Sequence, residues 1–323
     1  MLNNFSNTIA TPAISILLPV YNGGTYLVQS IKSILCQTIS DFELLIIDDC
    51  STDESYQYLQ NINDKRVAVY KNERNKGLFY NLNFLIKESS GSLIKLWSQD
   101  DIMYPACLAG FIAFHKKNPF IGFSYSGRDM IDEEGLVKIS KVVDNTPEII
   151  SPELHARIAF YTGSIAGNIS NVCINRSALE EVGYFNEQMK ISADFDMWVR
   201  LAKNHDTGFI RDKLLQLRDH SGQLSRKENY YINHVKEDLQ VYKNLMSYVS
   251  EQLAKEGKEL LRNYKLVFYY TLMVKALAKG KVKTAHKFYK ELSKADIFFS
   301  LSIAFLKAKT LKSRRPEFLN FYP

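Results

Sequence analysis

Short apolar runs alternate with segments of helical periodicity along the first third of the chain. Residues 13–20 and 42–47 are apolar runs, which predict buried strands, and Leu27, Ile31 and Ile34 recur between them at helical spacing. The alternation continues with a helix at about 53–62, a strand at 67–70, a helix at about 78–88 and a strand at 93–97. It predicts an α/β fold with a mainly parallel central sheet covered by helices.

Beyond residue 104 the pattern becomes less regular and then helical. A helix is predicted at 105–117 and a strand at 121–125, whereas residues 126–166 hold charges and turn residues without a long periodic segment. We expect residues 126–166 to be rich in loops and to lie over a binding cleft. From residue 230 onward the period is helical, with few breaking residues before Gly280, which predicts a separate C-terminal helical appendage.

Composition and charge narrow the class of protein. The 323 residues are 46% hydrophobic and 24% charged, which is typical of a globular chain of about two domains. The net charge of +6 is uneven, because residues 230–323 hold 18 Lys and Arg against 8 Asp and Glu. Charge alone allows nucleic acid or an anionic membrane as a partner. The aromatic residues of this region lie among aliphatic residues at helical spacing, without an RNA-binding motif, so we expect no nucleic-acid partner.

The sequence indicates a cytoplasmic location. The first twelve residues have neither the basic cluster nor the apolar core of a signal peptide. The four cysteines are scattered and form no C-x-x-C pair, which favours a reducing compartment and predicts neither a disulfide framework nor a zinc site.

An apolar run at 297–306 leaves a choice at the C-terminus. It is too short to span a bilayer and is followed by several Lys and Arg residues. It is either a buried helix of a small bundle or a helix that docks on the anionic inner face of the plasma membrane.

Acidic residues follow two of the predicted strands. Asp100 and Asp101 come directly after the strand at 93–97, and Asp48 and Asp49 end the strand before the 53–62 helix. In open α/β sheets, ligands collect beyond the carboxyl ends of the strands, and divalent cations that bridge phosphates favour carboxylate oxygens. No glycine-rich fingerprint and no Walker motif is present, so we expect a metal clamp to hold phosphate.

Two of these positions also have structural interpretations. Asp49 is suited to accept a hydrogen bond from a nucleobase N–H, or it forms a turn with Asp53 that starts the next helix. Asp194 precedes an apolar helical face at Phe195 and Trp198, and its structural interpretation is a helix N-cap.

Five segments together resemble the family 2 glycosyltransferases. They are Ser15–Asn22, Ile46–Asp53, Asn75–Gly77 with Asn83, Ser98–Asp101, and Ala193–Leu201. The match covers about residues 13–226. The resemblance implies a GT-A fold, with a nucleotide-binding half at about 13–125 and an acceptor and catalytic half at about 126–229, joined to the basic helical region at 230–323.

The resemblance also implies an activity. Members of this family transfer a sugar, here expected to be a hexosyl group, from a nucleotide diphosphate sugar to an acceptor hydroxyl with inversion. They usually need Mg²⁺ or Mn²⁺. We expect the acceptor to be a glycan or a lipid-linked glycan in surface polysaccharide biosynthesis.

The roles of individual residues follow from the same resemblance. Pro19, Tyr21 and Asp49 match the nucleoside contacts of the family, and Asp100 with Asp101 matches its acidic motif for the ribose and the metal. Asp194 matches the catalytic base, with Asp196 secondary because it lies on another helical face. Arg218 and His220 match a closing segment that approaches the diphosphate or its metal, together with Gln223 and Ser225.

One departure from the family pattern keeps other functions open. Many members have an aspartate where this chain has Ser98, so its motif is S-Q-D-D. A catalytically silent module that binds nucleotide sugars or glycans is one alternative. A metal-dependent phosphoryl-transfer enzyme that uses paired aspartates is the other.

Overall fold

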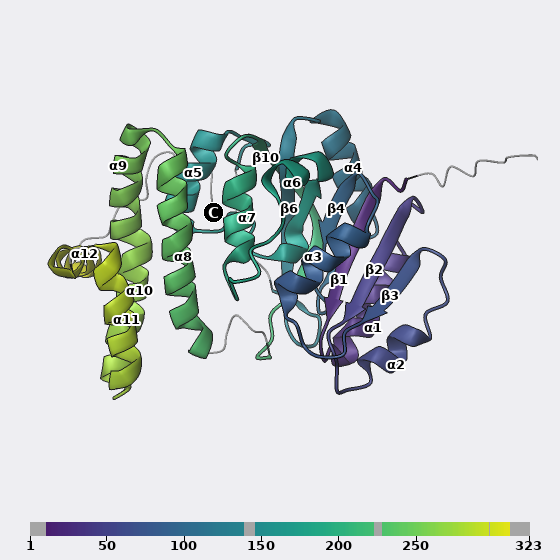
Figure 1. Ribbon diagram of the computed structural model, residues 1–323, viewed down its shortest axis with the longest axis horizontal. Coiled ribbons are helices and arrows are strands. Elements are labelled where there is room, and N and C mark those ends of the chain that lie inside the picture. Colours follow the sequence, from purple (N-terminus) through teal and green to yellow (C-terminus); the bar gives the residue numbers. More distant parts are fainter. Residues whose placement is uncertain (1–10, 139–145, 223–227, 297, 311–323) are drawn as a thin grey trace, which may run out of the picture.

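The computed structural model describes residues 11–138, 146–222, 228–296 and 298–310. Its first half alternates strands and helices (Figure 1): β1 (Ile14–Val20), α1 (Gly24–Leu35), β2 (Phe42–Asp48), α2 (Ser55–Gln60), β3 (Val67–Lys71), α3 (Leu78–Glu88) and β4 (Leu93–Leu96). These are the elements that the apolar runs predict. Strands β1, β2 and β4 are buried runs of mainly aliphatic residues because helices cover both faces of the sheet, whereas β3, at the edge of the sheet, is partly exposed.

The strands form one sheet in the order β3-β2-β1-β4-β9-β6-β10-β5. Strands β1 to β4 are parallel to their neighbours within this group, and β9 (Val172–Asn175) lies antiparallel between β4 and β6 (Ile121–Ile131). Strand β10 (Asp206–Arg218) runs parallel to β6, and β5 (Ile102–Met103) pairs with its end. Two short strands, β7 (Val137–Lys138) and β8 (Ile149–Ile150), complete the sheet. Because β2, β1 and β4 are neighbours, the loops after them meet at one edge.

The expectation that residues 126–166 are mainly loop is wrong in part. Strand β6 continues to Ile131, and α5 spans Pro152–Thr162. The start of α5 is locally encoded, since the Ser151 hydroxyl accepts a hydrogen bond from the Leu154 amide. The buried face of the helix is not purely apolar, because it includes His155. The apolar spacing that predicts a helix is therefore interrupted here.

Helices α4 (Cys107–Lys117), α6 (Arg176–Val182) and α7 (Ala193–Leu201) also pack on the sheet, and a 3₁₀ turn, Ile169–Asn171, precedes β9. The C-terminal region consists of α8 (Glu228–Tyr248), α9 (Glu251–Leu260), a π-helical segment (Leu261–Leu266), α10 (Val267–Ala278), α11 (Val282–Ala295) and α12 (Phe298–Thr310). In Figure 1 these helices stand beyond α7, on the side away from β2 and β3. None of the described helices is long and apolar enough to cross a membrane.

Two hydrophobic clusters form the core, one on each face of the sheet. One cluster joins the strands to α1, α2 and α4. The other includes α3, α5, α6 and α7 and continues without a break into α8, α9, α10, α11 and α12. The C-terminal helices therefore share a core with the sheet, and α8 lies directly beside α7.

Candidate functional site

The loops that follow β1, β2 and β4 are joined by hydrogen bonds. The Gln99 side chain pairs with the backbone of Tyr21, accepting from its amide at 2.9 Å and donating to its carbonyl oxygen at 3.0 Å. Asn22 accepts from the Thr52 amide at 2.8 Å, and the Asn22 amide donates to Ser51. Pro19 lies near the end of β1, and the Tyr21 side chain is 44% exposed, so it is able to contact a ligand at this edge.

Asp49 is a buried acceptor at the end of β2, 3% exposed. Its Oδ1 accepts from the Asn72 side chain and the Lys76 amide, both at 2.8 Å, and its Oδ2 accepts from the Gly77 amide at 2.9 Å. Asp49 therefore fixes the loop that enters α3, where Gly77 has a φ of 89°. Its contact with a nucleobase stays a prediction.

The carboxylate of Asp100 is held from two sides. Ser98 Oγ donates to Oδ1 at 2.6 Å, and His220 Nε2 lies 2.9 Å from Oδ2. The imidazole of His220 also packs against the ring of Tyr26, with 5.2 Å between the centroids. Ser98, where the chain departs from the family motif, thus orients Asp100.

Asp101 points into the protein. It is 1% exposed, and its Oδ1 accepts from the Arg218 amide at 2.9 Å. Burial, together with the neighbouring charge of Asp100, raises the pKa of Asp101 to about 7. Asp100 is the more accessible carboxylate of the pair.

The guanidinium of Arg218 is buried at the end of β10. It donates to the carbonyl oxygens of Asp100, Asp132 and Glu133 and to the Oε1 of Gln29. These contacts tie the S-Q-D-D loop to α1 and to the end of β6. Arg218 has a clear structural role, and its contact with a diphosphate stays a prediction.

Asp100 and His220 fit a small divalent cation. Their facing atoms are 2.9 Å apart, and adjacent ligands of an octahedral Mg²⁺ or Mn²⁺ are about 3 Å apart. Carboxylate oxygens suit both metals, whereas imidazole is a ligand for transition metals such as Mn²⁺ rather than for Mg²⁺. Within the described ranges, no group of three or more His, Cys, Asp or Glu side chains is arranged to hold a metal. The pair therefore suits a metal that takes further ligands from phosphate oxygens.

Asp194 lies in the first turn of α7, and the prediction that it is the N-cap is wrong. The N-cap is Ser192, and the helix begins at Ala193. Asp194 is already inside the helix, where its Oδ1 accepts from the Phe195 amide at 2.7 Å. The Ser192 hydroxyl does not cap the helix, because it donates to Asp238 of α8 instead.

The surroundings of Asp194 oppose its ionisation. The pKa of this carboxyl group is raised to about 7, mainly by burial and also by the charges of Asp238 and Glu237, although the Phe195 amide acts to lower it. A helix N-terminus stabilises a carboxylate, but here burial has the larger effect. Protein surrounds the carboxyl group, although the residue as a whole keeps some accessible surface. The group can therefore take up or release a proton near neutral pH.

Asp196 is buried on another face of α7 and forms an ion pair with Arg200, at 2.8 Å from its Nε. Arg200 in turn donates to carbonyl oxygens at the end of α6 and just after it. The described contacts of Asp196 thus hold α6 against α7. Its contact with an acceptor or a diphosphate stays a prediction.

Asn83 connects α3 with the segment that leads to α7. Its side chain donates to the Phe185 carbonyl and to Glu187, and it accepts from the Phe185 amide at 2.9 Å. The rings of Phe79 and Phe185 stack beside these bonds. The first half of the chain therefore helps to place the helix that carries Asp194.

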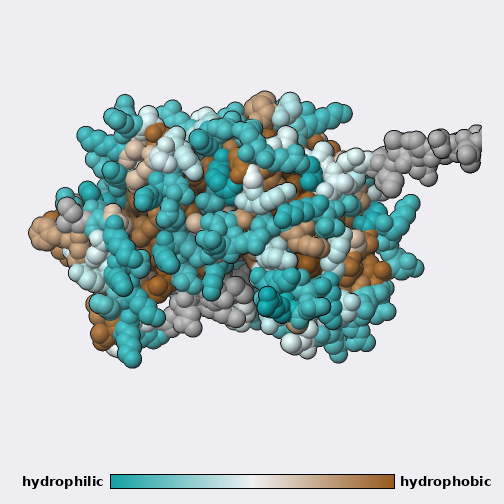
Figure 2. Space-filling view, viewed as in Figure 1, coloured by the Kyte–Doolittle hydropathy of each residue, from teal (hydrophilic) through white to brown (hydrophobic). Residues whose placement is uncertain are grey.

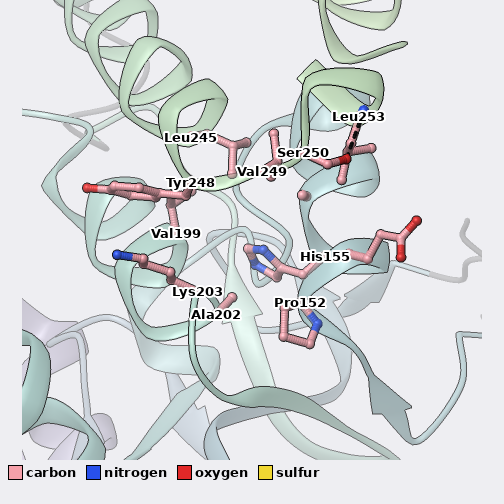
Figure 3. A pocket seen from close by; sticks show the side chains of 12 residues that line it. Pro152, His155, Val199, Ala202, Lys203, Leu245, Tyr248, Val249, Ser250 and Leu253 are labelled. Atoms are coloured by element: carbon pink, nitrogen blue, oxygen red, sulfur yellow. Dashed lines mark hydrogen bonds between the residues drawn. The ribbon is translucent and has the colours of Figure 1, made fainter. Parts of the chain in front are cut away.

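A separate pocket of about 220 Å³ lies between α5, α7, α8 and α9 (Figure 3). His155 lines it from α5, Val199 and Lys203 from α7 and the turn after it, and Tyr248 from α8. These residues lie at the C-terminal end of α7, whereas Asp194 is at its N-terminal end. The pocket is therefore distinct from the candidate catalytic site.

Comparison with known proteins decides the family. Residues 15–183 match the profile described as glycosyl transferase family 2. The chain belongs to this family. The fold is the GT-A fold, as the sequence resemblance predicts, with a C-terminal helical region.

Relatives of this family 2 glycosyltransferase occur in several bacteria. It is 27% identical to an uncharacterized glycosyltransferase of Rickettsia prowazekii over 283 residues, and this alignment covers 85% of this chain and 83% of that protein. It is 30% identical over 225 residues to one from Rickettsia felis, which covers 68% of this chain but only 36% of that longer protein. A putative colanic acid biosynthesis glycosyl transferase, WcaA of Escherichia coli, is 29% identical over 59% of this chain and 66% of its own length.

Solved structures with the same fold include two with nucleotide sugars. Staphylococcus aureus TarS in complex with UDP-GlcNAc matches with a TM-score of 0.68 at 16% identity, over 87% of this chain and 80% of that one. The mannosyltransferase PcManGT of Pyrobaculum calidifontis, in complex with GDP-Man and Mn²⁺, matches with a TM-score of 0.56 at 12% identity, over 94% of this chain and 88% of that one.

The structure brings some predicted residues together and adds others. Hydrogen bonds connect the strand ends and loops that hold Tyr21, Asp100, Asp101, Arg218 and His220, whereas Asp194 and Asp196 lie on α7 with contacts of their own. Gln223 and Ser225 fall outside the described residues.

Sequence reasoning assigned no role to Gln99, Gln29, Tyr26, Glu237 or Asp238. Gln99 had a local signal, since it stands inside the acidic motif, whereas the others act across 45 or more residues of sequence.

Proposed function

We propose that this glycosyltransferase transfers a hexosyl group, with inversion, from a nucleotide diphosphate sugar to the hydroxyl of a glycan or lipid-linked glycan. The observation that carries the proposal is the carboxyl group of Asp194, whose pKa of about 7 suits a general base. The complexes of TarS with UDP-GlcNAc and of PcManGT with GDP-Man support a donor of this class.

The donor would lie across the loops after β1, β2 and β4. Tyr21 and Pro19 would contact the nucleoside, with Asp49 accepting from the base or holding the loop that does. Asp100 and His220 would hold Mg²⁺ or Mn²⁺, with Asp101 behind Asp100 as a positioning residue. The bound metal would neutralise the charge that develops on the nucleoside diphosphate as it leaves. The Mn²⁺ in the PcManGT complex supports this assignment.

The chemistry would be a single displacement. The acceptor hydroxyl gives its proton to the Asp194 carboxylate, its oxygen forms a bond to the anomeric carbon, and the bond from that carbon to the diphosphate oxygen breaks. Attack from the face opposite the leaving group inverts the anomeric centre. The chain then needs no nucleophile of its own, and the protein around Asp194 limits the access of competing water.

The proposed acceptor and location rest on a sequence similarity and on the exposed surface of α12. The similarity to WcaA, named for colanic acid biosynthesis, supports a role in surface polysaccharide assembly. Helix α12 exposes Phe299 and Leu306 beside Lys307 and Lys309. This combination supports peripheral contact of a cytoplasmic enzyme with an anionic membrane.

The experiment is a donor screen followed by product analysis. Thermal shifts with nucleotide diphosphate sugars and Mn²⁺ would identify the donor, because a ligand stabilises the folded state in proportion to its occupancy. The product should then carry the intact sugar with inverted anomeric configuration, with the nucleoside diphosphate released. Release of inorganic phosphate would instead identify a phosphoryl-transfer enzyme. Tight binding without turnover on a panel of lipid-linked glycans would identify a silent binding module.

A further inference from the structure

Two adjacent acidic residues of α8 hold the segment that enters α7. Glu237 accepts three successive backbone amides: Lys190 donates to Oε1 at 3.0 Å, while Ile191 and Ser192 both donate to Oε2 at 2.9 Å. A carboxylate that accepts three amides fixes both the position and the orientation of the backbone. The turn before α7 is therefore set by a residue that lies 45 positions later in the chain.

Asp238 completes this support from within the core. It is buried, and its Oδ1 accepts from the Ser192 hydroxyl at 2.6 Å. Its Oδ2 accepts from the Tyr269 hydroxyl of α10, and Lys265 Nζ lies 3.5 Å away. Lys265 belongs to the π-helical segment between α9 and α10, a feature that is common at functional sites. Three parts of the C-terminal region thus converge on the N-cap of α7.

Side-chain packing also connects α7 with α8. The Phe195 ring of α7 meets the Tyr242 ring of α8 edge to face, with 5.3 Å between the centroids. Both side chains are buried, so α7 cannot shift along α8 without opening the core. Asp194 lies between Ser192, which Asp238 holds, and Phe195, which Tyr242 holds.

We propose that Glu237 and Asp238 are positioning residues for the reaction, which makes the C-terminal helices part of the catalytic apparatus. They hold the start of α7 so that the Asp194 carboxylate stands where the acceptor hydroxyl arrives. The inference rests on the proposed role of Asp194 as the base. Small displacements matter in this geometry, since a shift of about 1 Å costs up to about 100-fold in rate.

The two carboxylates also affect when the base is ionised. The titratable and charged groups that α8, the π-helical segment and α10 bring to this cluster are His234, Glu237, Asp238, Tyr242, Lys265 and Tyr269. The negative charges of Asp238 and Glu237 favour the protonated form of Asp194, so they raise its pKa. Removing either charge should let Asp194 ionise at lower pH.

The test compares Asp238→Asn, Glu237→Gln and Ser192→Ala with the full-length wild type. We expect kcat for transfer to fall about 10- to 100-fold, with the dissociation constant of the donor changed less than about twofold. In Asp238→Asn and Glu237→Gln, the acid limb of the kcat profile should move to lower pH. Ser192→Ala removes the contact without removing a charge, so it should lower kcat without moving the limb. Glu259→Gln, at an exposed position of α9, is the matched control and should match the wild type.

A double-mutant comparison distinguishes a failure of this inference from a failure of the proposed role of Asp194 as the base. In an Asp194→Asn background, Asp238→Asn should lower the residual rate little further, because its effect passes through Asp194. If Asp194→Asn itself transfers sugar at the wild-type rate, the assignment of the base fails. If Asp194→Asn is inactive while folded Asp238→Asn and Glu237→Gln keep the wild-type kcat and pH profile, this inference alone is overturned. Donor binding and thermal melting show whether each variant is folded. If Asp238→Asn does not fold, Ser192→Ala and Glu237→Gln carry the test.

Discussion

Asp194 shows how two opposing effects set the chemistry of one residue. Its place in the first turn of α7 favours the carboxylate, whereas its burial and the two nearby carboxylates favour the acid. Burial has the larger effect and brings the pKa to about 7. A base with this pKa is largely ionised just above neutral pH and still holds a proton well, which is the compromise that general-base catalysis needs.

Asp194→Asn should abolish most of the turnover. The amide keeps the size of the side chain and an oxygen for the Phe195 amide, so the fold and donor binding should survive. Loss of the proton acceptor should lower kcat about 10²- to 10⁴-fold, measured by steady-state transfer kinetics. Asp196→Asn is the matched control, and its broken pair with Arg200 should reduce stability rather than kcat. A larger loss of kcat in Asp196→Asn would show that the base is misassigned.

The pH dependence of kcat should have an acid limb near pH 7. Asp194 acts as a base only when ionised, so kcat should fall about tenfold per pH unit below its pKa of about 7 and level off above it. Initial rates at saturating donor and acceptor between about pH 5 and 9 would measure the limb. A limb near about pH 4, the range of an ordinary carboxyl group, would contradict the burial of Asp194 in the working enzyme.

The metal assignment separates two neighbouring aspartates. Asp100→Ala and His220→Ala should each weaken Mn²⁺-dependent binding of the nucleoside diphosphate, measured by calorimetry with and without EDTA, because each removes a ligand. Asp101→Asn should weaken it less, since Asp101 points inward to the Arg218 amide. Undiminished Mn²⁺-dependent binding in the Asp100→Ala and His220→Ala double variant would refute the assignment.

The place of the candidate site could be predicted because its residues stand in local motifs at strand ends, whereas the roles of these residues stay predictions. The sequence could not show that Arg218 is buried among carbonyl acceptors, or that Asp49 is already engaged by two backbone amides. Both facts depend on loops that approach one another only in the fold. Hydrogen-bond partners of this kind leave no periodic signal in the sequence.

At the scale of elements, the strands and helices from β1 to α4 could be predicted from the sequence. In this part of the chain the spacing of apolar residues and the positions of turn residues indicate the same elements. The later strands were harder because β9 enters the sheet between β4 and β6, away from its neighbours in sequence. The length of β10 was also hidden, since its pairing with β6 is interrupted by irregularities after Asp206 and around Lys213. Pairing across long loops is a property of the whole sheet, so a local pattern does not encode it.

Contact between α5 and α9 depends on a glycine. A side chain at Gly257 would overlap the ring of Phe160, which is fully buried. We expect Gly257→Ala to lower the free energy of unfolding by about 1–3 kcal/mol, because overpacking outweighs the gain in helix propensity. Urea denaturation would measure it. Lys258→Ala, at the next and exposed position of α9, should stay within about 0.5 kcal/mol of the wild type. If Gly257→Ala is as stable as the wild type, this contact is looser than the structure indicates.

At the scale of the molecule, one hydrophobic cluster runs from the sheet through α7 into the C-terminal helices. Phe288 and Leu292 of α11 and Leu301 of α12 are buried in it. Deleting residues 275–323 would therefore expose part of the hydrophobic core. A loss of binding in such a truncated protein could not be assigned to the outer surface of α12. Point changes on the exposed face of α12 avoid this problem.

Membrane contact is the prediction that this surface supports. Phe299 is 74% exposed and Leu306 60% exposed on α12, next to Lys307 and Lys309, and Figure 2 shows an apolar surface over this helix at the left edge. Each basic side chain near an anionic surface contributes about 1 kcal/mol, and apolar side chains that enter the headgroup layer add to it.

The test is flotation with vesicles of phosphatidylglycerol and phosphatidylcholine. The wild type should float with anionic vesicles and should be released by high salt, because salt screens the lysine contribution. Phe299→Ser with Leu306→Ser should reduce flotation while leaving the fold and donor binding unchanged. Phe120→Ser, an exposed apolar residue between α4 and β6, is the matched control. Equal flotation of the double variant, or no flotation of the wild type, would refute the idea. A concentration-dependent dimer that the double variant abolishes would assign this face to a second copy of the chain instead.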